Sequence, residues 1–309
     1  MNHIYKLIWC MASNCFIVVS ELAKGNKKSI SCTKKKSLLS VVLISILPVS
    51  TSFAVENEVP LNISGKNQQV VNTSKISNVN IINNITIEKI GNGKHAIEAV
   101  IDNTTSTGNI SIKNTGNLKT NGNHAFGIFA ENKDVGDIKI EHSGNISTNG
   151  LASHGIYAKS DADGASQKIN IDVKKSNIMI NDSLATNDNE IAYHVYAEQD
   201  NIQSGDVNIN VSDSKLSGIS GDYGSTAVYI KSKSDKGNLL ATLNNTDISL
   251  DGFNADGVHL VNLSDTSAGD ITIETNSGSI VSKIQRVTLN IIMLFLVTKK
   301  VKMPQVIFV

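Results

Sequence analysis

Three histidines are the first side chains in this sequence whose type and spacing suggest chemistry. His95, His124 and His154 each precede a similar short apolar motif, at intervals of 29 and 30 residues. A row of imidazoles at one position of a repeat can ligate metal ions or act as bases. In the next copy of the motif, alignment on Val195-Tyr196-Ala197 places Tyr193 at this position. We therefore interpret the histidines as turn residues of a repeat and expect no metal site here.

Acidic residues suggest two other kinds of site. The segment Asp161-Ala162-Asp163-Gly164 matches the start of a calcium loop, but its glycine comes too early and no glutamate closes the loop. Asp188 with Glu190, or Asp235 with an acid of a neighbouring repeat, have the chemistry for glycoside hydrolysis, which requires carboxyl groups about 5 to 9.5 Å apart. Stacked repeats place acids at such separations by accident. We predict that the protein is not an enzyme, with no catalytic, metal-ligating or cofactor-binding residue.

Four rings recur at one further position. Tyr157, Tyr196, Tyr229 and His259 each follow the first aliphatic residue of the motif. Because neighbouring side chains of a strand point to opposite faces, the rings and these aliphatics lie on different faces. If the aliphatics point inward, the rings form an exposed stripe suited to contact with a glycan or a protein partner. If the register is reversed, the rings are stacked in the core. The sequence leaves both alternatives open.

These positions belong to a repeated unit, and residues 155–178 are a representative copy. Gly155-Ile156-Tyr157-Ala158 is followed by a polar loop, by Ile169-Asn170-Ile171-Asp172-Val173 and by Ser176-Asn177-Ile178. Strict alternation of apolar and polar residues is typical of a half-buried strand, so each unit predicts three short strands. Their central aliphatics recur through six copies: Ile97, Ile128, Ile156, Val195, Val228 and Val258 for the first strand; Ile110, Ile138, Ile169, Val207, Leu239 and Ile271 for the second; Leu118, Ile146, Ile178, Leu216, Ile248 and Ile280 for the third.

A period of 28 to 39 residues indicates a repeat array. Helical repeats are excluded because no segment has apolar residues at helical spacing, and glycine and asparagine are frequent. A propeller blade needs four strands, whereas each unit here has three. We predict an all-β fold, a right-handed parallel β-helix (β-solenoid) with three short strands per coil and about six to seven coils. At about 4.8 Å per coil, the rod is on the order of 30 Å tall.

The charge distribution excludes two classes of partner. Residues 55–282 contain 16 lysines and no arginine against 27 acidic residues, a formal charge of −11, and the neutrality of the whole chain comes from its basic ends. Nucleic-acid binding depends on Lys and Arg side chains that neutralise phosphates, and anionic membranes attract basic surfaces. We therefore expect no nucleic acid and no anionic membrane surface as a partner.

The first 54 residues have the features of an export signal. Lys34-Lys35-Lys36, the apolar run 38–49 and the small residues before the cut are the three parts of a secretory signal peptide. The apolar run is too short for a membrane-spanning helix. We predict export by the Sec machinery and cleavage between Ala54 and Val55. All three cysteines precede this bond, so no disulfide can lock the mature chain before it crosses a second membrane.

A long extension lies ahead of this signal. Its matching residues are Met1-Asn2, Ile4-Tyr5-Lys6, Ile8-Trp9, Asn14-Cys15 and Val18-Val19-Ser20-Glu21-Leu22-Ala23-Lys24. The segment resembles the extended signal peptide region of type V secretion proteins, the bacterial autotransporters and their relatives. Cys10-Met11 departs from the family pattern, which usually has Asn-Lys. The resemblance covers about the first 25 residues and implies export of a β-helical, adhesin-like passenger. We expect the signal segment itself to be helical.

These patterns divide the chain into five regions. We predict an extended signal region (1–25), a signal core with its cleavage site (26–54), an N-terminal cap or first coil (55–94), solenoid repeats (95–282) and an aberrant hydrophobic tail (283–309). Glycines and acids disappear from the tail, and residues 291–297 are apolar without alternation. Our hypothesis is that a frameshift or premature end has replaced the natural continuation; a native hydrophobic cap is the alternative. An outer-membrane barrel needs several strands of about ten residues, and we expect none after Ser282.

The function implied by the resemblance is surface contact. We expect a non-catalytic passenger fragment of an autotransporter adhesin, without cofactors, whose partner is a host glycan or protein receptor if the chain is displayed. The family implies the cell surface or outer membrane; for this fragment we expect the periplasm or the medium. The first alternative is an exoprotein of a two-partner secretion system. A polysaccharide-acting β-helix enzyme is less favoured, because the repeats contain no arginine to serve as a basic partner.

Overall fold

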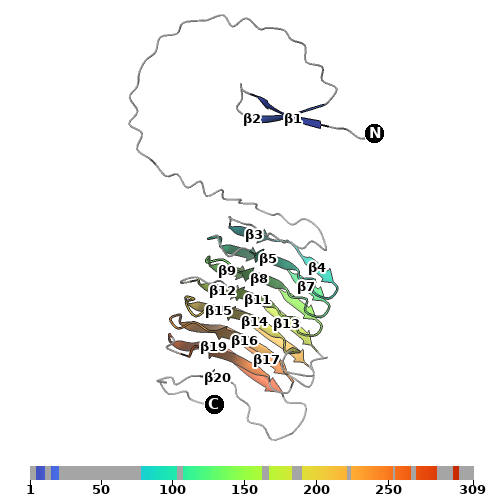
Figure 1. Cartoon of the computed structure of the whole chain (residues 1–309). Coiled ribbons are helices and arrows are strands. Elements are labelled where there is room, and N and C mark those ends of the chain that lie inside the picture. The colour runs from blue at the N-terminus through green and yellow to red at the C-terminus, as the bar shows by residue number, and fades with distance from the viewer. Residues whose placement is uncertain are drawn as a thin grey trace, which may run out of the picture. The chain divides into compact units, whose positions relative to one another are not determined.

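The structure is a computed structural model of the chain. It describes residues 5–10, 15–20, 78–102, 107–161, 167–182, 190–220, 224–252, 255–265, 269–283 and 295–298. The chain divides into two compact units, Met1–Ser52 and Phe53–Val309 (Figure 1). Within the described ranges, no helix is long and apolar enough to cross a membrane.

The first unit contains a pair of antiparallel strands. β1 (Tyr5–Cys10) pairs with β2 (Cys15–Ser20), and Tyr5 lies opposite Ser20. The helix that we expected for the signal segment is therefore wrong for these residues. The strand sequences YKLIWC and CFIVVS are rich in β-branched and aromatic side chains. Such side chains lose rotamer freedom in a helix and pack well on a pleated surface.

The second unit is a stack of parallel strands arranged in three columns (Figure 1). The first column is a seven-stranded sheet: β5 (Ile97–Ile101), β8 (Ile128–Asn132), β11 (Ile156–Ser160), β14 (Tyr193–Gln199), β16 (Thr226–Ser232), β18 (Asp256–Asn262) and β20 (Phe295–Thr298). The second column begins with β3 (Val79–Asn83), β6 (Ile110–Asn114), β9 (Ile138–His142) and β12 (Ile169–Lys174), and the third with β4 (Ile87–Ile90), β7 (Leu118–Asn121), β10 (Ile146–Asn149) and β13 (Asn177–Asp182). Both continue in β15 (Val207–Ser220), β17 (Leu239–Asp251) and β19 (Ile271–Lys283).

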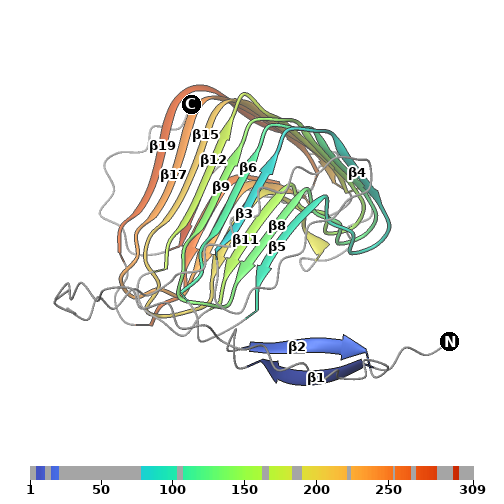
Figure 2. The same ribbon diagram turned by 90° about the horizontal axis from the view of Figure 1, so that it is seen from above.

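The pairing between coils follows the register of the sequence repeats. Ile156 of β11 lies between Ile128 of β8 and Val195 of β14, and all pairings among the described strands of this unit are parallel. Seen from above, β5, β8 and β11 lie on one side of the coil, β3, β6 and β9 on a second, and β4 on a third (Figure 2). The predicted all-β solenoid of six to seven coils is thus confirmed, whereas its right-handed sense stays a prediction.

Aliphatic side chains from the three columns fill the interior of the solenoid. The side chains at the predicted central positions, such as Ile156, Ile169 and Ile178, are fully buried. They belong to one continuous core that extends from Val79 to Ile271. Along each strand, buried and outward residues alternate, as in the burial of Ile156, Ala158 and Ser160 on β11. The strands therefore form because one face of each can be removed from water while its backbone is paired above and below.

The turns before the second column explain the recurring Gly-Asp and Gly-Asn pairs. A Cβ on Gly136 would lie 1.9 Å from the backbone oxygen of Gly108 in the coil below, so only glycine lets the turns approach this closely. The next residue forms a ladder between coils. The Asn109 side-chain oxygen accepts the Asp137 backbone N–H at 2.7 Å, and the Asp137 carboxylate accepts the Lys168 N–H at 2.9 Å. These side-chain oxygens therefore satisfy backbone N–H groups of the turns, which are not paired in a strand.

The later coils differ from the three-strand pattern. β15, β17 and β19 are single bent strands of 14, 13 and 13 residues that pass through the corner between the second and third columns. The earlier coils have Gly116 and Gly144 at this corner, whereas Ser214 of β15 pairs with Thr246 of β17. From β15 to β19 the ladder continues through the bend, with Thr246 opposite Gly278 of β19.

One segment of the hydrophobic tail joins the solenoid. β20 pairs in parallel with β18, with Phe295 opposite Val258 and Val297 opposite Leu260. The interval from Val258 to Phe295 is 37 residues, which lies within the range of the other repeats. Residues 295–298 therefore add a strand to the first column, while the rest of the tail after Lys283 lies outside the described residues. The frameshift hypothesis stays a prediction.

Candidate contact surface

The contact stripe, defined as Tyr157, Tyr196, Tyr229 and His259, lies on the outer face of the seven-stranded sheet. The four residues are consecutive partners in register on β11, β14, β16 and β18. The aliphatics before the tyrosines (Ile156, Val195 and Val228) are fully buried, so the rings project away from the core. Tyr196 is only 8% exposed, and the other three rings are partly exposed. Phe129 of β8 continues the stripe below Tyr157.

A second ring column lies beside the stripe at the start of the same strands. It consists of His95, Phe126, His154 and Tyr193, with successive ring centroids 4.5, 4.6 and 5.0 Å apart. His124 is not a member, because it is an exposed corner residue with a φ of 53°. The histidine series inferred from the sequence therefore mixes two positions of the coil. Counting back two residues from each first-strand aliphatic would have identified the column.

The rings of the two columns stack on one another. Tyr157 and Tyr196 are nearly parallel, with centroids 4.6 Å apart and an interplanar angle of 3°. Tyr193 stacks across the columns on Tyr229 at 4.9 Å and 11°. Stacked and edge-to-face pairs each contribute about 0.5 to 1.5 kcal/mol beyond the burial of their area. Because neighbouring rings cover the ring faces, the surface mainly presents ring edges.

The histidines of the second ring column are held neutral. Burial lowers the pKa of His95 to about 4. Burial, followed by the neighbouring imidazoles of His124 and His95, lowers the pKa of His154 to about 3. Desolvation penalises the charged imidazolium, so both rings are neutral at physiological pH. They act as packing groups in the ring stack.

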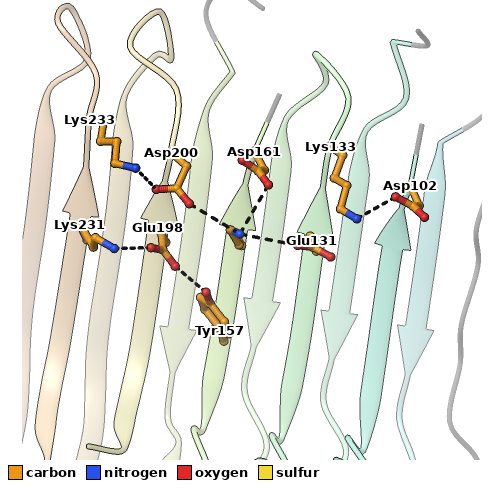
Figure 3. A network of polar contacts seen from close by, with 10 residues as sticks. Asp102, Glu131, Lys133, Tyr157, Asp161, Glu198, Asp200, Lys231 and Lys233 are labelled. Carbon is orange, nitrogen blue, oxygen red and sulfur yellow. Dashed lines mark hydrogen bonds and ion pairs between the residues drawn. The ribbon is translucent and has the colours of Figure 1, made fainter. Parts of the chain in front are cut away.

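A charge ladder runs along the same face, two residues further along each strand. It consists of Glu131, Lys159, Glu198 and Lys231, which alternate in sign from β8 to β16. Lys231 Nζ lies 2.6 Å from Glu198 Oε1, and Lys159 Nζ lies 3.9 Å from Glu131 Oε1. Figure 3 shows these contacts together with an outer set of charges: Asp102, Lys133, Asp161, Asp200 and Lys233.

The outer charges tie neighbouring coils together. Lys133 pairs with Asp102 at 2.8 Å, and Lys233 pairs with Asp200 at 2.9 Å. Lys159 lies at the centre of the network, since its ammonium group is also 3.5 Å from Asp161 and 3.6 Å from Asp200. Exposed ion pairs contribute little stability singly. Asp161 and Asp200 occupy the same position of neighbouring coils, and the Lys159 ammonium between them offsets the repulsion of these like charges.

Glu198 connects the charge ladder to the contact stripe. Its carboxylate accepts a hydrogen bond of 2.5 Å from the Tyr157 hydroxyl and pairs with Lys231 on its other oxygen. Burial, with the Glu198 carboxylate as the next cause, raises the pKa of the Tyr157 hydroxyl. Burial also raises the pKa of Tyr196, again with Glu198 nearby. The Tyr229 hydroxyl has no hydrogen-bond partner among the described residues, so it is available to an external ligand.

The other candidates from the sequence lie only partly within the described residues. Asp161 contacts Lys159, whereas residues 162–164 of the calcium-like segment and Asp188 lie outside the described residues. No group of three His, Cys, Asp or Glu side chains able to hold a metal ion occurs in the described ranges. The predicted cleavage bond between Ala54 and Val55 also lies outside them and stays a prediction.

Comparison with known proteins identifies the N-terminal segment. Residues 1–49 match the family model of the extended signal peptide of the type V secretion system. The match covers both the extension and most of the signal core that we inferred from the sequence. No curated protein and no solved structure matches the chain.

Proposed function

Since an extended signal peptide of type V secretion and a β-solenoid in one chain fit a type V secretion autotransporter, we propose that this exported passenger acts by contact, without catalysis. The contact stripe and the adjoining charge ladder form the contact surface. The partner is a protein on a host cell or in its surrounding matrix. The chain acts at the cell surface or in the medium, as an adhesin.

The outer face of the seven-stranded sheet carries this proposal. Aromatic and imidazole rings run without interruption from His95, which precedes β5, to His259 of β18, with positive and negative groups beside them (Figure 3). Tyrosine is enriched in protein interfaces because its ring supplies area and its hydroxyl a hydrogen bond. The ring faces are already stacked on one another, which disfavours a sugar laid flat on them. Ring edges, the Tyr229 hydroxyl and paired charges suit a protein surface instead.

Two observations support a role without catalysis. The buried imidazole of His154 is stacked on Phe126. The Tyr157 hydroxyl donates its hydrogen bond to Glu198. The lysines of the face are paired with carboxylates, so none is poised as a general base. The arrangement presents charges of both signs, which suits recognition of a surface with complementary charges.

A binding experiment tests the proposal. The full chain would be expressed in a Gram-negative host, and the processed protein would be measured by biolayer interferometry against purified matrix and cell-surface proteins. The variant is Tyr229→Ser, because this ring is partly exposed and its hydroxyl is available. The control is Met179→Ser on the third column, where the methionine is 47% exposed but lies away from the stripe.

We expect Tyr229→Ser to weaken binding more than ten-fold, since a central interface tyrosine typically contributes about 2 kcal/mol. Met179→Ser should bind as the wild type does. Equal binding by the wild type and Tyr229→Ser would rule out the stripe as the contact surface. Loss of binding in both variants would point to a general loss of folding, which circular dichroism of the same samples detects.

A further inference from the structure

A second surface with free polar groups lies at the corner between the second and third columns. We call it the corner groove. One wall consists of Lys175, Asp213 and Asn245, and the other of Asn177, Lys215 and Asp247, with Ser176 and Ser214 at the floor. It is a shallow, open surface groove with a volume of about 430 Å³. The groove spans the coils of β12 to β17 and is separate from the contact stripe.

Backbone strain marks one wall of the groove. Lys175, Asp213 and Asn245 have φ values of 50°, 49° and 47°, in the left-handed region that favours glycine. Asparagine and aspartate tolerate this region, but lysine does not benefit from it. Glycine at position 175 would relieve the strain without altering the bend. The same conformation recurs in Ser277 of the next coil, so it belongs to the bend, and in Lys175 it leaves the side chain directed to solvent.

The groove contains cations without partners. The Lys175 and Lys215 side chains form no ion pair and no hydrogen bond among the described residues, whereas the lysines of the charge ladder are paired. The two aspartates of the groove use only part of their capacity to accept hydrogen bonds. Asp213 accepts one from Asn245 at 2.9 Å, and Asp247 accepts one from Ser279 at 2.6 Å. Free donors and free acceptor positions therefore face the same space.

The balance of these groups indicates the ligand. Two lysines and two aspartates cancel in charge, so neither a polyanion nor a polycation is favoured. Hydroxyl groups both donate and accept hydrogen bonds and would satisfy both kinds of group. Asn177, Lys215 and Asp247 are successive partners in register, and neighbouring strands lie about 4.8 Å apart. This spacing is comparable to one sugar unit of an extended chain.

We propose that the corner groove binds a neutral oligosaccharide whose chain runs parallel to the solenoid axis. Lys175, Asn177 and Lys215 donate hydrogen bonds to its hydroxyls, and Asp213 and Asp247 accept them. The site is independent of the contact stripe: a chain that failed to bind any protein through Tyr229 would still bind the sugar.

The test uses the processed protein made from the full chain and an array of neutral, sialylated and sulfated oligosaccharides. Lys175→Gly removes the donor and the backbone strain together, so it should weaken binding to neutral sugars at least ten-fold while raising the urea midpoint. Lys215→Met removes a donor at a position of ordinary φ, so it should weaken binding without changing the midpoint. Ser277→Gly relaxes a left-handed residue that does not line the groove (φ 59°), so it should raise the midpoint and leave binding unchanged.

Three results would overturn the proposal. The first is that the wild type binds no neutral oligosaccharide, and the second is that it binds only the sialylated or sulfated ones. The third is that Lys175→Gly and Lys215→Met both bind neutral sugars as strongly as the wild type does. Tyr229→Ser on the same array separates the two surfaces, because it should retain the binding of neutral sugars. Loss of sugar binding in Tyr229→Ser would assign the sugar to the stripe instead.

Discussion

A buried histidine in the second column makes the stability of the solenoid dependent on pH. His142 continues a stack of polar side chains inside the corner after β3, β6 and β9. The Asn83 amide donates to the Asn114 oxygen at 2.6 Å, and the Asn114 amide nitrogen lies 2.8 Å from His142 Nδ1. Because the Asn114 oxygen already accepts from Asn83, its nitrogen donates to Nδ1. Protonation of Nδ1 would therefore oppose two donors inside the core.

The magnitude follows from the pKa of this imidazole. Burial lowers the pKa of His142 to about 4, against about 6.5 in the unfolded chain. Above pH 6.5 the ring is neutral in both states and the fold has its full stability. Below pH 6.5 the unfolded chain binds a proton that the native state does not, so the free energy of unfolding falls until about pH 4. The loss from this residue is about 2 kcal/mol at pH 5 and about 3 kcal/mol in full.

The variant His142→Asn tests this reasoning, because it extends the asparagine stack with a side chain that does not titrate. Urea unfolding at pH 7 and pH 5 gives the free energy of unfolding of the wild type and the variant. We expect the fall between the two pH values to be about 2 kcal/mol smaller in His142→Asn. Met179→Asn, a change at an exposed side chain that does not titrate, should keep the fall of the wild type. An equal fall in the wild type and His142→Asn would refute the account of the buried stack.

Three further predictions concern the turns, the stripe and the signal. Gly136→Ala should destabilise the fold by about 1 to 3 kcal/mol, measured by urea unfolding, because its Cβ would meet the Gly108 oxygen at 1.9 Å; unchanged stability would contradict the close turn packing. Tyr157→Phe should cost about 1 to 3 kcal/mol in the same assay, because it leaves Glu198 without its 2.5 Å hydrogen bond; no loss would mean that water replaces the hydroxyl. Mass spectrometry of the exported protein should find Val55 as the first residue, and an unprocessed chain would exclude the predicted cut.

The solenoid could be predicted because its pattern is repeated. A single alternating segment such as 169–173 is weak evidence, but the same alternation at three positions through six copies fixes which residues are buried. The charge ladder was equally accessible. Glu131, Lys159, Glu198 and Lys231 stand three residues after the first-strand aliphatic and alternate in sign. These charges form a ladder only when the four strands are aligned on that aliphatic.

Other features depend on contacts that the sequence does not display. His194 is completely buried and fills the position that glycine occupies in two earlier coils, Gly127 and Gly155. The exchange is accommodated by Gly218, at which a Cβ would lie 3.1 Å from the His194 ring. The size of His194 on β14 and the absence of a side chain at Gly218 on β15 therefore account for one another. In the same way, the left-handed conformation of His124 depends on the bend of the coil, so its difference from His95 and His154 could not be inferred from spacing.

Cysteine labelling tests most directly whether the chain is an exported solenoid with its rings outward. All three native cysteines precede the predicted cut, so a new thiol in the processed protein is unique. Tyr229→Cys and Val228→Cys would be expressed in a Gram-negative host, and the exported fraction treated with a membrane-impermeant maleimide. Val228 is fully buried and Tyr229 is partly exposed. We expect processed protein labelled at position 229 at once and at position 228 only in urea. Equal labelling of both sites without urea, or labelling only after lysis of the inner membrane, would contradict the account.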